Sequence, residues 1–324
     1  MAESPTAAAD PLAAPSADPL SRAERFIWLT GRVLEQRRFA HLFRGADPGP
    51  VETALSAYAN EDGGYGHALE PDVRGPSSQP LPTMTALRLL DELGLCGGQH
   101  AERICRWLTT VTNHDGALPA VLPSLRDYPH PPYLRVPDDP PSELLATGAV
   151  VGTLHRNEVW HAWLFRATEF CWRAVESLDR THPYEAEAAV AFLDGVPDRA
   201  RAERAAARLG RIVRERQLVV LEPRRASVLP VSPGYAPGEH HFAYDYARTP
   251  DSLARRWFSD AEMERALDAL AAAQEDDGGW PIRWREWAPG TRLEWRPIVT
   301  IEALRTLRAY GREPGLSPER APGR

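Results

Sequence analysis

Apolar residues recur every three to four positions along most of this chain, and no segment alternates apolar and polar residues as a half-buried strand does. Several of these periodic segments begin with Ser, Thr or Asp followed by Pro or an acidic residue, which favour the start of a helix. The pattern therefore predicts an all-α fold, with helices over residues 21–39, 51–59, 81–93, 99–111, 141–154, 158–177, 183–193, 197–216, 250–258, 259–273 and 297–309.

A short motif occurs twice, and each copy follows a predicted helix. Residues 60–66 read NEDGGYG and residues 274–281 read QEDDGGWP. A second similar helix follows each copy, with TALRLL from Thr85 and EALRTL from Glu302. The spacing from Gly64 to Ala86 is 22 residues and from Gly279 to Ala303 it is 24. This near-equality predicts one architecture built from repeats.

Weaker copies extend the repeat through the middle of the chain. Residues 114–117 (HDGA) and 221–223 (LEP) follow predicted helices, and five units of 53–56 residues fit if the third has lost its turn. Loops after alternate helices predict helix pairs, each with an inner and an outer helix. Two Pro-rich insertions, 118–140 and 221–249, are long enough to indicate functional loops or lids.

The repeated turn resembles a known motif. Residues 274–280, with Gln, Asp, Gly-Gly and Trp, resemble the Q-W repeat of terpenoid cyclases and protein prenyltransferase β-subunits, and residues 60–65 are a variant with Asn and Tyr. Those families share an α/α toroid whose inner helices line a central, largely apolar pocket for isoprenoids. The resemblance implies an α/α toroid of about five to six helix pairs here. Similar Gly-Gly-Trp-Pro turns also occur in toroidal polysaccharide lyases.

The chain departs from those families at their catalytic motifs. It has no Asp-rich acid motif of the D-x-D-D kind and no zinc ligands with the prenyltransferase spacing. Residues 138–143 (DDPPSE) superficially resemble a magnesium-binding motif, but the two prolines prevent helical spacing of the acids and favour a loop before a helix.

Composition excludes several function classes. All 38 basic residues are Arg, so a P-loop, a Lys Schiff base and a pyridoxal-phosphate anchor are impossible. A net charge of −7 without a basic stripe disfavours nucleic-acid binding. No apolar run is long enough for a transmembrane segment. Three scattered cysteines predict neither a disulfide framework nor a zinc site, and we expect a reduced, cytoplasmic protein.

The ends of the chain differ in composition from the rest. Residues 1–20 are rich in Ala, Pro, Ser and acidic residues without the pattern of a signal peptide, and residues 312–324 are similar. We therefore expect disordered tails at 1–20 and 312–324 that flank a single toroid domain over 21–311. The oligomeric state stays open.

Acidic residues after the turns are the candidate catalytic groups, because loops at those positions would overhang a central pocket. They are Glu70, Asp72, Glu294 and Asp245, and the first three lie beside Arg74 and Arg296. Their simplest role is a surface ion pair or a helix cap. Burial in an apolar mouth would instead raise their pKa and make one of them a proton donor.

Aromatic residues are the candidate substrate contacts. At this density they usually form core, but lining a cavity they would supply apolar walls, stabilise cations or stack on sugars. With the two arginines, the predicted substrate-binding set is Arg74, Arg296, Tyr65, Trp280, Trp284, Trp295, Trp163, Tyr244 and His241. His241 belongs to a Pro- and Gly-rich loop that is poorly suited to hold metal ligands rigidly. The loop could instead act as a lid that carries an acid/base His. We predict no metal and no cofactor.

Three functions remain open from sequence. The resemblance favours a terpenoid-cyclase-like enzyme that binds an isoprenoid or other apolar chain and starts metal-independent carbocation chemistry by proton donation. A toroidal polysaccharide lyase or glycoside-processing enzyme would use the same acids, Arg74 and the tryptophans to hold sugars. The third is a non-catalytic repeat scaffold that binds a lipid or a protein.

Overall fold

The computed structural model describes residues 18–312 and confirms the all-α prediction. In this range the only β-type pairings are two isolated bridges. The α-helices are α1 (Pro19–Thr30), α2 (Val33–Arg44), α3 (Gly49–Ser56), α4 (Pro80–Glu92), α5 (Gly98–Val111), α6 (Leu144–Arg156), α7 (Ala162–Ser177), α8 (Pro183–Gly195), α9 (Arg199–Glu215), α10 (Ala243–Tyr246), α11 (Asp260–Ala272) and α12 (Pro289–Ala309). Short 3-10 helices are η1 (Pro123–Asp127), η2 (Pro223–Val228) and η3 (Leu253–Trp257).

Three predicted helices differ substantially from the observed ones, and the others differ only at their ends. The helix predicted over 21–39 is two helices, because Gly31 takes an extended conformation and ends α1. The segment 250–258 forms only η3. The last helix begins at Pro289 and not at Pro297, the start that the sequence predicts, so Pro297 lies inside it. Proline favours the start of a helix because it lacks a backbone N–H group. Inside a helix it removes one backbone hydrogen bond, which costs stability but does not end α12 at Pro297.

Other predictions fall partly or wholly outside the described residues. The predicted disordered tails 1–20 and 312–324 lie outside them except for residues 18–20 and 312, and α1 already begins at Pro19.

A buried apolar cluster draws residues from α1 to α12, between Leu20 and Leu307.

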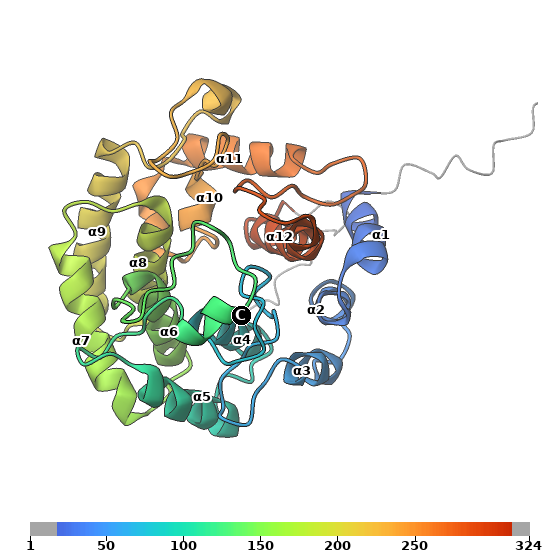
Figure 1. Cartoon of the computed structure of the whole chain (residues 1–324). Helices are drawn as coiled ribbons and strands as arrows, with labels where there is room; N and C mark the ends of the chain where they lie inside the picture. The colour runs from blue at the N-terminus through green and yellow to red at the C-terminus, as the bar shows by residue number, and fades with distance from the viewer. Residues whose placement is uncertain (1–17, 313–324) are drawn as a thin grey trace, which may run out of the picture.

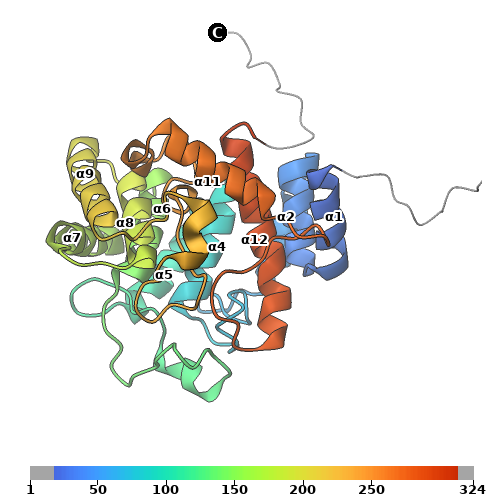
Figure 2. The same cartoon turned by 90° about the horizontal axis from the view of Figure 1, so that it is seen from above.

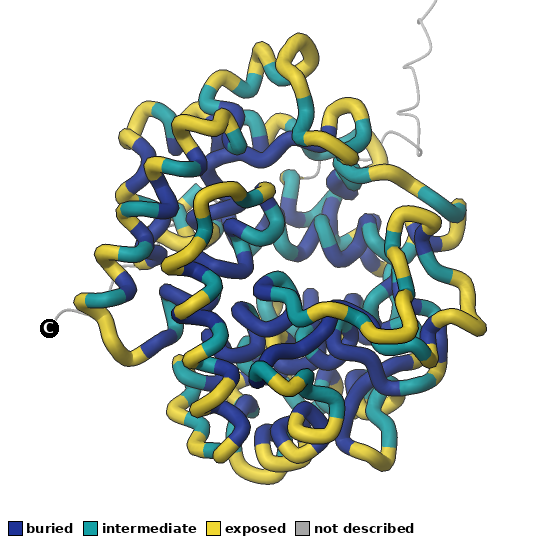
Figure 3. The backbone as a smooth tube through the Cα atoms, turned by 60° about the vertical axis from the view of Figure 1, so that its left-hand side comes forward, coloured by how far each residue is buried: buried dark blue, intermediate teal, exposed yellow. Residues whose placement is uncertain are grey.

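Most of the helices form an inner row and an outer row in Figure 1. In that view α4, α6, α8, α10 and α12 surround the centre, and α1, α5, α7, α9 and α11 lie outside them. Contacts join α4 to α6, α6 to α8, and α8 to α10, while α12 contacts α11, α1 and α2. Figure 2 shows long loops gathered at one end of the molecule, and Figure 3 shows exposed residues around the outside and buried ones toward the middle.

The closest helix pair of the inner row is α6 with α8. Their backbones meet at glycines, where a Cβ added to Gly152 would lie 2.1 Å from the carbonyl oxygen of Ala191. A Cβ on Gly148 would lie 2.7 Å from the carbonyl oxygen of Ala188. Small residues are therefore a steric requirement of this contact.

The repeated turn has the same hydrogen bonds in three places. The N–H groups of Tyr65, Leu118 and Trp280 each donate to a threonine hydroxyl on the following inner helix, at 3.0, 2.9 and 2.9 Å. These threonines are Thr83, Thr147 and Thr300. In each turn an aspartate side chain also accepts the N–H two residues ahead, and these are Asp62, Asp115 and Asp277.

The first glycine of each turn packs against the neighbouring outer helix. Gly63, Gly116 and Gly278 all have positive φ, at 97°, 93° and 92°. A Cβ on Gly63 or Gly116 would collide with Arg103 of α5 or Arg166 of α7. The turn after α11 makes the same contact with Arg22 of α1, so the end of the repeat array meets its beginning.

Candidate active site

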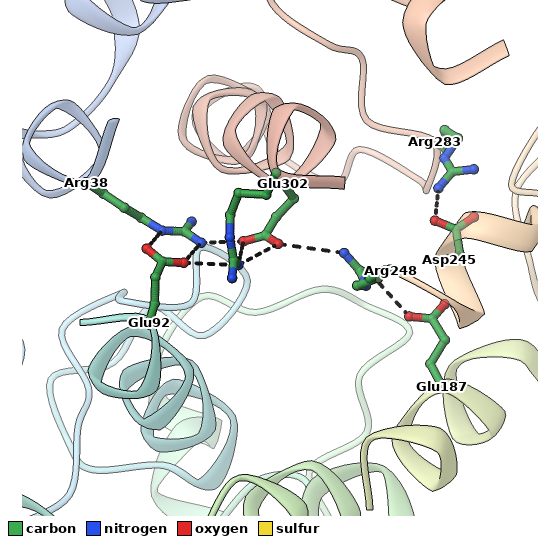
Figure 4. A network of polar contacts seen from close by, with 8 residues as sticks. Arg38, Glu92, Glu187, Asp245, Arg248, Arg283 and Glu302 are labelled. Carbon is green, nitrogen blue, oxygen red and sulfur yellow. Dashed lines mark hydrogen bonds and ion pairs between the residues drawn. The ribbon is translucent and has the colours of Figure 1, made fainter. Parts of the chain in front are cut away.

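Charged side chains from several helices meet at the centre of the molecule (Figure 4). Arg38 of α2 donates to both oxygens of Glu92 on α4 at 2.7 Å and to Glu302 on α12 at 2.5 Å. Arg248, which follows α10, lies 3.8 Å from Glu302 and 3.4 Å from Glu187 on α8. We call this set, with Arg305 of α12 and Arg88 of α4, the central cluster.

Part of the central cluster is deeply buried and part is exposed to solvent. Arg38 and Glu92 keep only 4% and 3% of their side chains exposed, whereas Arg248 and Arg305 keep 47% and 41%. Arg88 is also exposed, although burial and the charges of Arg38 and Arg248 lower its pKa. Solvent therefore reaches part of the central cluster, at Arg88, Arg248 and Arg305.

Arg88 differs from its neighbours because it makes no hydrogen bond or ion pair with another residue in the described range 18–312. The nearest carboxylate on α12, Glu302, is shared by Arg38, Arg248 and Arg305. Arg88 therefore presents an unpaired guanidinium group next to solvent.

Glu70 lies beside Arg88, in the loop that leads to α4. Its Oε2 accepts a 2.8 Å hydrogen bond from the hydroxyl of Thr85, one helical turn before Arg88. Burial raises the pKa of Glu70 to about 7, and the charge of Asp72 adds to this shift. The Thr85 hydrogen bond and the charges of Arg88 and Arg32 oppose it. Glu70 is thus poised to exchange a proton near neutral pH.

Asp72 lies beside one tryptophan from the segment before α12, Trp287, and one from α12 itself, Trp295. The indole N–H of Trp287 donates to its Oδ1 at 2.7 Å. Trp295 also lies close enough to lower its pKa, although its indole N–H falls outside hydrogen-bond geometry. Burial outweighs both and raises the pKa of Asp72. Trp284 packs edge-on against Trp295 with ring centres 5.0 Å apart.

The other two predicted acids are paired with arginines. Glu294 accepts a 2.6 Å hydrogen bond from Arg74. Asp245 accepts from Arg283 at 2.7 Å and from the N–H of Phe242 at 2.8 Å. Burial would raise the pKa of Asp245, but the charges of Arg283 and His241 hold it below the usual value. Asp245, held ionised, is a poor proton donor, and the carboxyl of Glu294 is engaged by Arg74, so we assign a catalytic role to neither.

His241 and Tyr244 lie near Asp245 on the same loop-to-helix segment. The Nε2 of His241 lies 2.9 Å from Glu187, while its Nδ1 is buried without a hydrogen-bond partner among residues 18–312. Tyr244 stacks on Phe242 and accepts a hydrogen bond from Arg283 at 3.2 Å.

The remaining predicted contacts occupy packed positions. Tyr65 and Trp280 are buried in turns, and the indole of Trp163 donates to Thr112. Arg296 pairs with Glu275 and Asp277 and stacks on Phe26. We therefore leave these four residues out of the proposed site.

Sequence reasoning missed the central cluster. The signal was the similarity of the two inner helices, in which Arg88 matches Arg305 and Thr85 matches Glu302. Polar side chains at matching positions of two repeated helices indicate that both side chains point toward the same part of the fold. A single repeated Arg, however, is also what an ordinary solvent-exposed helix face contains.

Neither a metal cluster nor a membrane span is found in the described range. Over residues 18–312 no group of three or more His, Cys, Asp and Glu side chains could hold a metal ion. Likewise, none of the helices from α1 to α12 has the length and apolar character needed to cross a bilayer.

Comparison with known proteins identifies no relative: no protein-family model matches the chain, and neither does any curated protein.

Proposed function

We propose that the protein is a glycoside-processing enzyme in which Glu70 and Asp72 form the acid–base pair. The proposal rests mainly on one arrangement: Glu70, held by the hydroxyl of Thr85, lies beside the carboxyl of Asp72 and beside Arg88, which has no ion-pair partner among residues 18–312. Burial raises the pKa of Glu70 in this arrangement to about 7. Paired carboxyls whose pKa values are set by different surroundings are the usual catalysts of glycosidic bond hydrolysis.

The chemistry assigns a separate role to each carboxyl. Protonated Glu70 donates its proton to the glycosidic oxygen as the bond from that oxygen to the anomeric carbon breaks. Ionised Asp72 accepts a proton from the water that attacks the anomeric carbon. Trp287 keeps the Asp72 carboxylate in place through its hydrogen bond. The bond from the anomeric carbon to the glycosidic oxygen is thus replaced by a bond to the oxygen of water, and the step uses no cofactor.

The surroundings of the pair support a sugar substrate. Trp284 and Trp295 form an edge-on aromatic pair beside Asp72, and aromatic faces stack on the apolar faces of sugar rings. We further propose that the two rows of helices close into the α/α toroid expected from the repeat, because the last turn packs on α1 as earlier turns pack on α5 and α7.

A panel of neutral and acidic oligosaccharides tests this function. We expect cleavage of at least one, measured as new reducing ends and by mass spectrometry, which also separates hydrolysis from elimination. Glu70→Gln is expected to lower kcat by about 10²-fold or more with little change in KM. Glu61→Gln, an exposed residue of the first turn, serves as the matched control. Absence of cleavage across the panel would reject the proposal.

A terpenoid-cyclase-like function is the second candidate, favoured by the tryptophans around Asp72. In that case Asp72 in its protonated form donates to an alkene of an isoprenoid chain, and the indole rings stabilise the resulting carbocation. The charged central cluster fits an apolar chain less well than a polar substrate, because burial against it would strip water from the charges.

Incubation with farnesyl, geranylgeranyl and squalene-type substrates tests the second candidate. A cyclised product that disappears in Asp72→Asn, while oligosaccharides stay intact, would favour it over sugar hydrolysis. No product and no bound lipid would exclude it.

A further inference from the structure

The central cluster contains an arginine in excess of its carboxylates. Arg38, Arg248 and Arg305 share Glu92, Glu187 and Glu302 through ion pairs of 2.5–3.8 Å. Arg88 has no such partner in the described range, and Glu302 beside it is already shared by the other three arginines.

We propose that Arg88 binds a carboxylate of the substrate, and that this binding is coupled to uptake of a proton by Glu70. The inference deepens the proposed function, on which it rests, by naming the substrate class as an acidic sugar such as a uronate. A guanidinium group suits this ligand because its fork of N–H donors matches a planar carboxylate.

The coupling follows from the charges that face the two groups. Glu70 faces Thr85 and Arg88 on α4, Asp72 in its own loop, and Arg32 before α2. Arg32 is already engaged, because it pairs with Glu35 at 2.8 Å and donates to the carbonyl of Ala68 at 2.8 Å. Arg88 is therefore the cation left to balance Glu70 when Glu70 is ionised.

Arg88 faces a second set of charges on other elements. These are Glu302 on α12, Arg38 on α2 and Arg248 after α10. The two arginines disfavour its charge, as burial does, and an anionic ligand would relieve both effects.

The sign of the pH dependence follows from these contacts. Ionised Glu70 repels an incoming anion, so the anion binds best when Glu70 is protonated. Because the pKa of Glu70 is about 7, affinity is high below that pH and falls above it. The limit is about tenfold per pH unit, which corresponds to one proton taken up per ligand.

Isothermal titration calorimetry of the full chain tests the inference with three probes. Glucuronate carries the carboxylate, glucose is the neutral match, and inorganic phosphate tests whether any small anion suffices. We expect glucuronate to bind more tightly than glucose and phosphate, with an affinity that falls above pH about 7. Titration in two buffers of different ionisation enthalpy measures the proton uptake directly.

Four variants separate binding from folding. Arg88→Gln is expected to abolish the preference for glucuronate over glucose, and Arg88→Lys to keep part of it. Glu70→Gln should bind glucuronate with no pH dependence. Arg106→Gln, whose side chain is 70% exposed on α5, is the matched control and should bind as the wild type does. Because Arg88 has no ion pair to lose within residues 18–312, its variants should unfold at nearly the wild-type temperature.

The outcomes separate this inference from the proposed function. Glucuronate that binds no better than glucose, or an affinity that does not change with pH, would overturn the inference even if neutral oligosaccharides are cleaved. Tighter binding of phosphate than of glucuronate would overturn the assignment to a carboxylate. Proton-coupled glucuronate binding without cleavage of any oligosaccharide would uphold the anion site and reject hydrolysis.

Discussion

At the residue scale, the surroundings of Glu70 determine what the site is able to do. Desolvation favours its neutral form, and the hydroxyl of Thr85 and the charges of Arg88 and Arg32 only partly offset this. A carboxyl in this state costs stability when it ionises, because the unfolded chain ionises it freely. The cost should be visible in the pH dependence of unfolding.

Glu70→Gln should stabilise the protein at alkaline pH. The folded-state pKa of about 7 lies above the ordinary glutamate value of 4.5, so the folded protein holds the proton more tightly. Stability from this group is present below pH about 4.5 and is lost as pH rises through about 7. The variant should gain on the order of 1–3 kcal/mol over wild type at pH about 9 and little at pH about 4, measured by urea unfolding. An equal effect at both pH values would contradict the assigned pKa.

The sequence predicted the two acids of the site, Glu70 and Asp72, but it did not predict Arg88. Glu70 and Asp72 stood out because they follow a repeated turn, where a loop over the centre is expected. Arg88 occupies an amphipathic helix with few distinguishing neighbours. Its isolation depends on Glu302 being shared by Arg38, Arg248 and Arg305, which are remote in sequence.

At the element scale, the turns and the glycine contacts hold neighbouring helices at fixed distances. The first turn glycine needs both a positive φ and the absence of a side chain, because a Cβ on Gly63 would lie 2.5 Å from the carbonyl oxygen of Arg103. The sequence showed the motif, but only the structure identifies the outer helix on which it packs.

Gly63→Ala should destabilise the protein by about 2–4 kcal/mol, from the positive φ and the collision together. Gly45→Ala is the matched control, because Gly45 has a φ of 68° and nothing within 4 Å of the added Cβ. It should cost about 1 kcal/mol, the contribution of backbone strain alone. Equal losses in thermal or urea unfolding would mean that the contact with α5 is unimportant.

Gly152→Ala should separate α6 from α8 and cost about 2–4 kcal/mol, because the methyl group would meet the backbone of Ala191. Gly290→Ala in α12, where nothing lies within 4 Å, should change stability by less than about 1 kcal/mol. A tolerated alanine at Gly152, with unchanged urea unfolding, would show that the two helices are not in tight contact.

At the scale of the whole molecule, Arg38 joins two inner helices that are far apart in sequence. It binds Glu92 of α4 and Glu302 of α12 from its position on α2. Repeats in the sequence predicted helix pairs, and α4 and α12 are in the inner row in Figure 1. The repeats did not predict that charged residues would occupy the centre, because the resemblance to isoprenoid enzymes favoured an apolar pocket.

Arg38→Met should cost about 3–5 kcal/mol, because it leaves Glu92 buried with fewer partners. Arg106→Met, which removes an exposed pair with Glu102, should cost less than about 0.5 kcal/mol. Urea unfolding of both variants gives the comparison. A loss at Arg38 as small as that at Arg106 would show that the central cluster contributes little to holding α2, α4 and α12 together.

The most direct test of the account is an NMR titration of the Glu70 side-chain carboxyl in ¹³C-labelled protein, assigned by comparison with Glu70→Gln. We predict a midpoint near pH 7, the value to which burial raises its pKa. A midpoint near the ordinary value of 4.5 would contradict the account, because Glu70 would then be ionised at neutral pH and could neither donate a proton to substrate nor take one up with an anion.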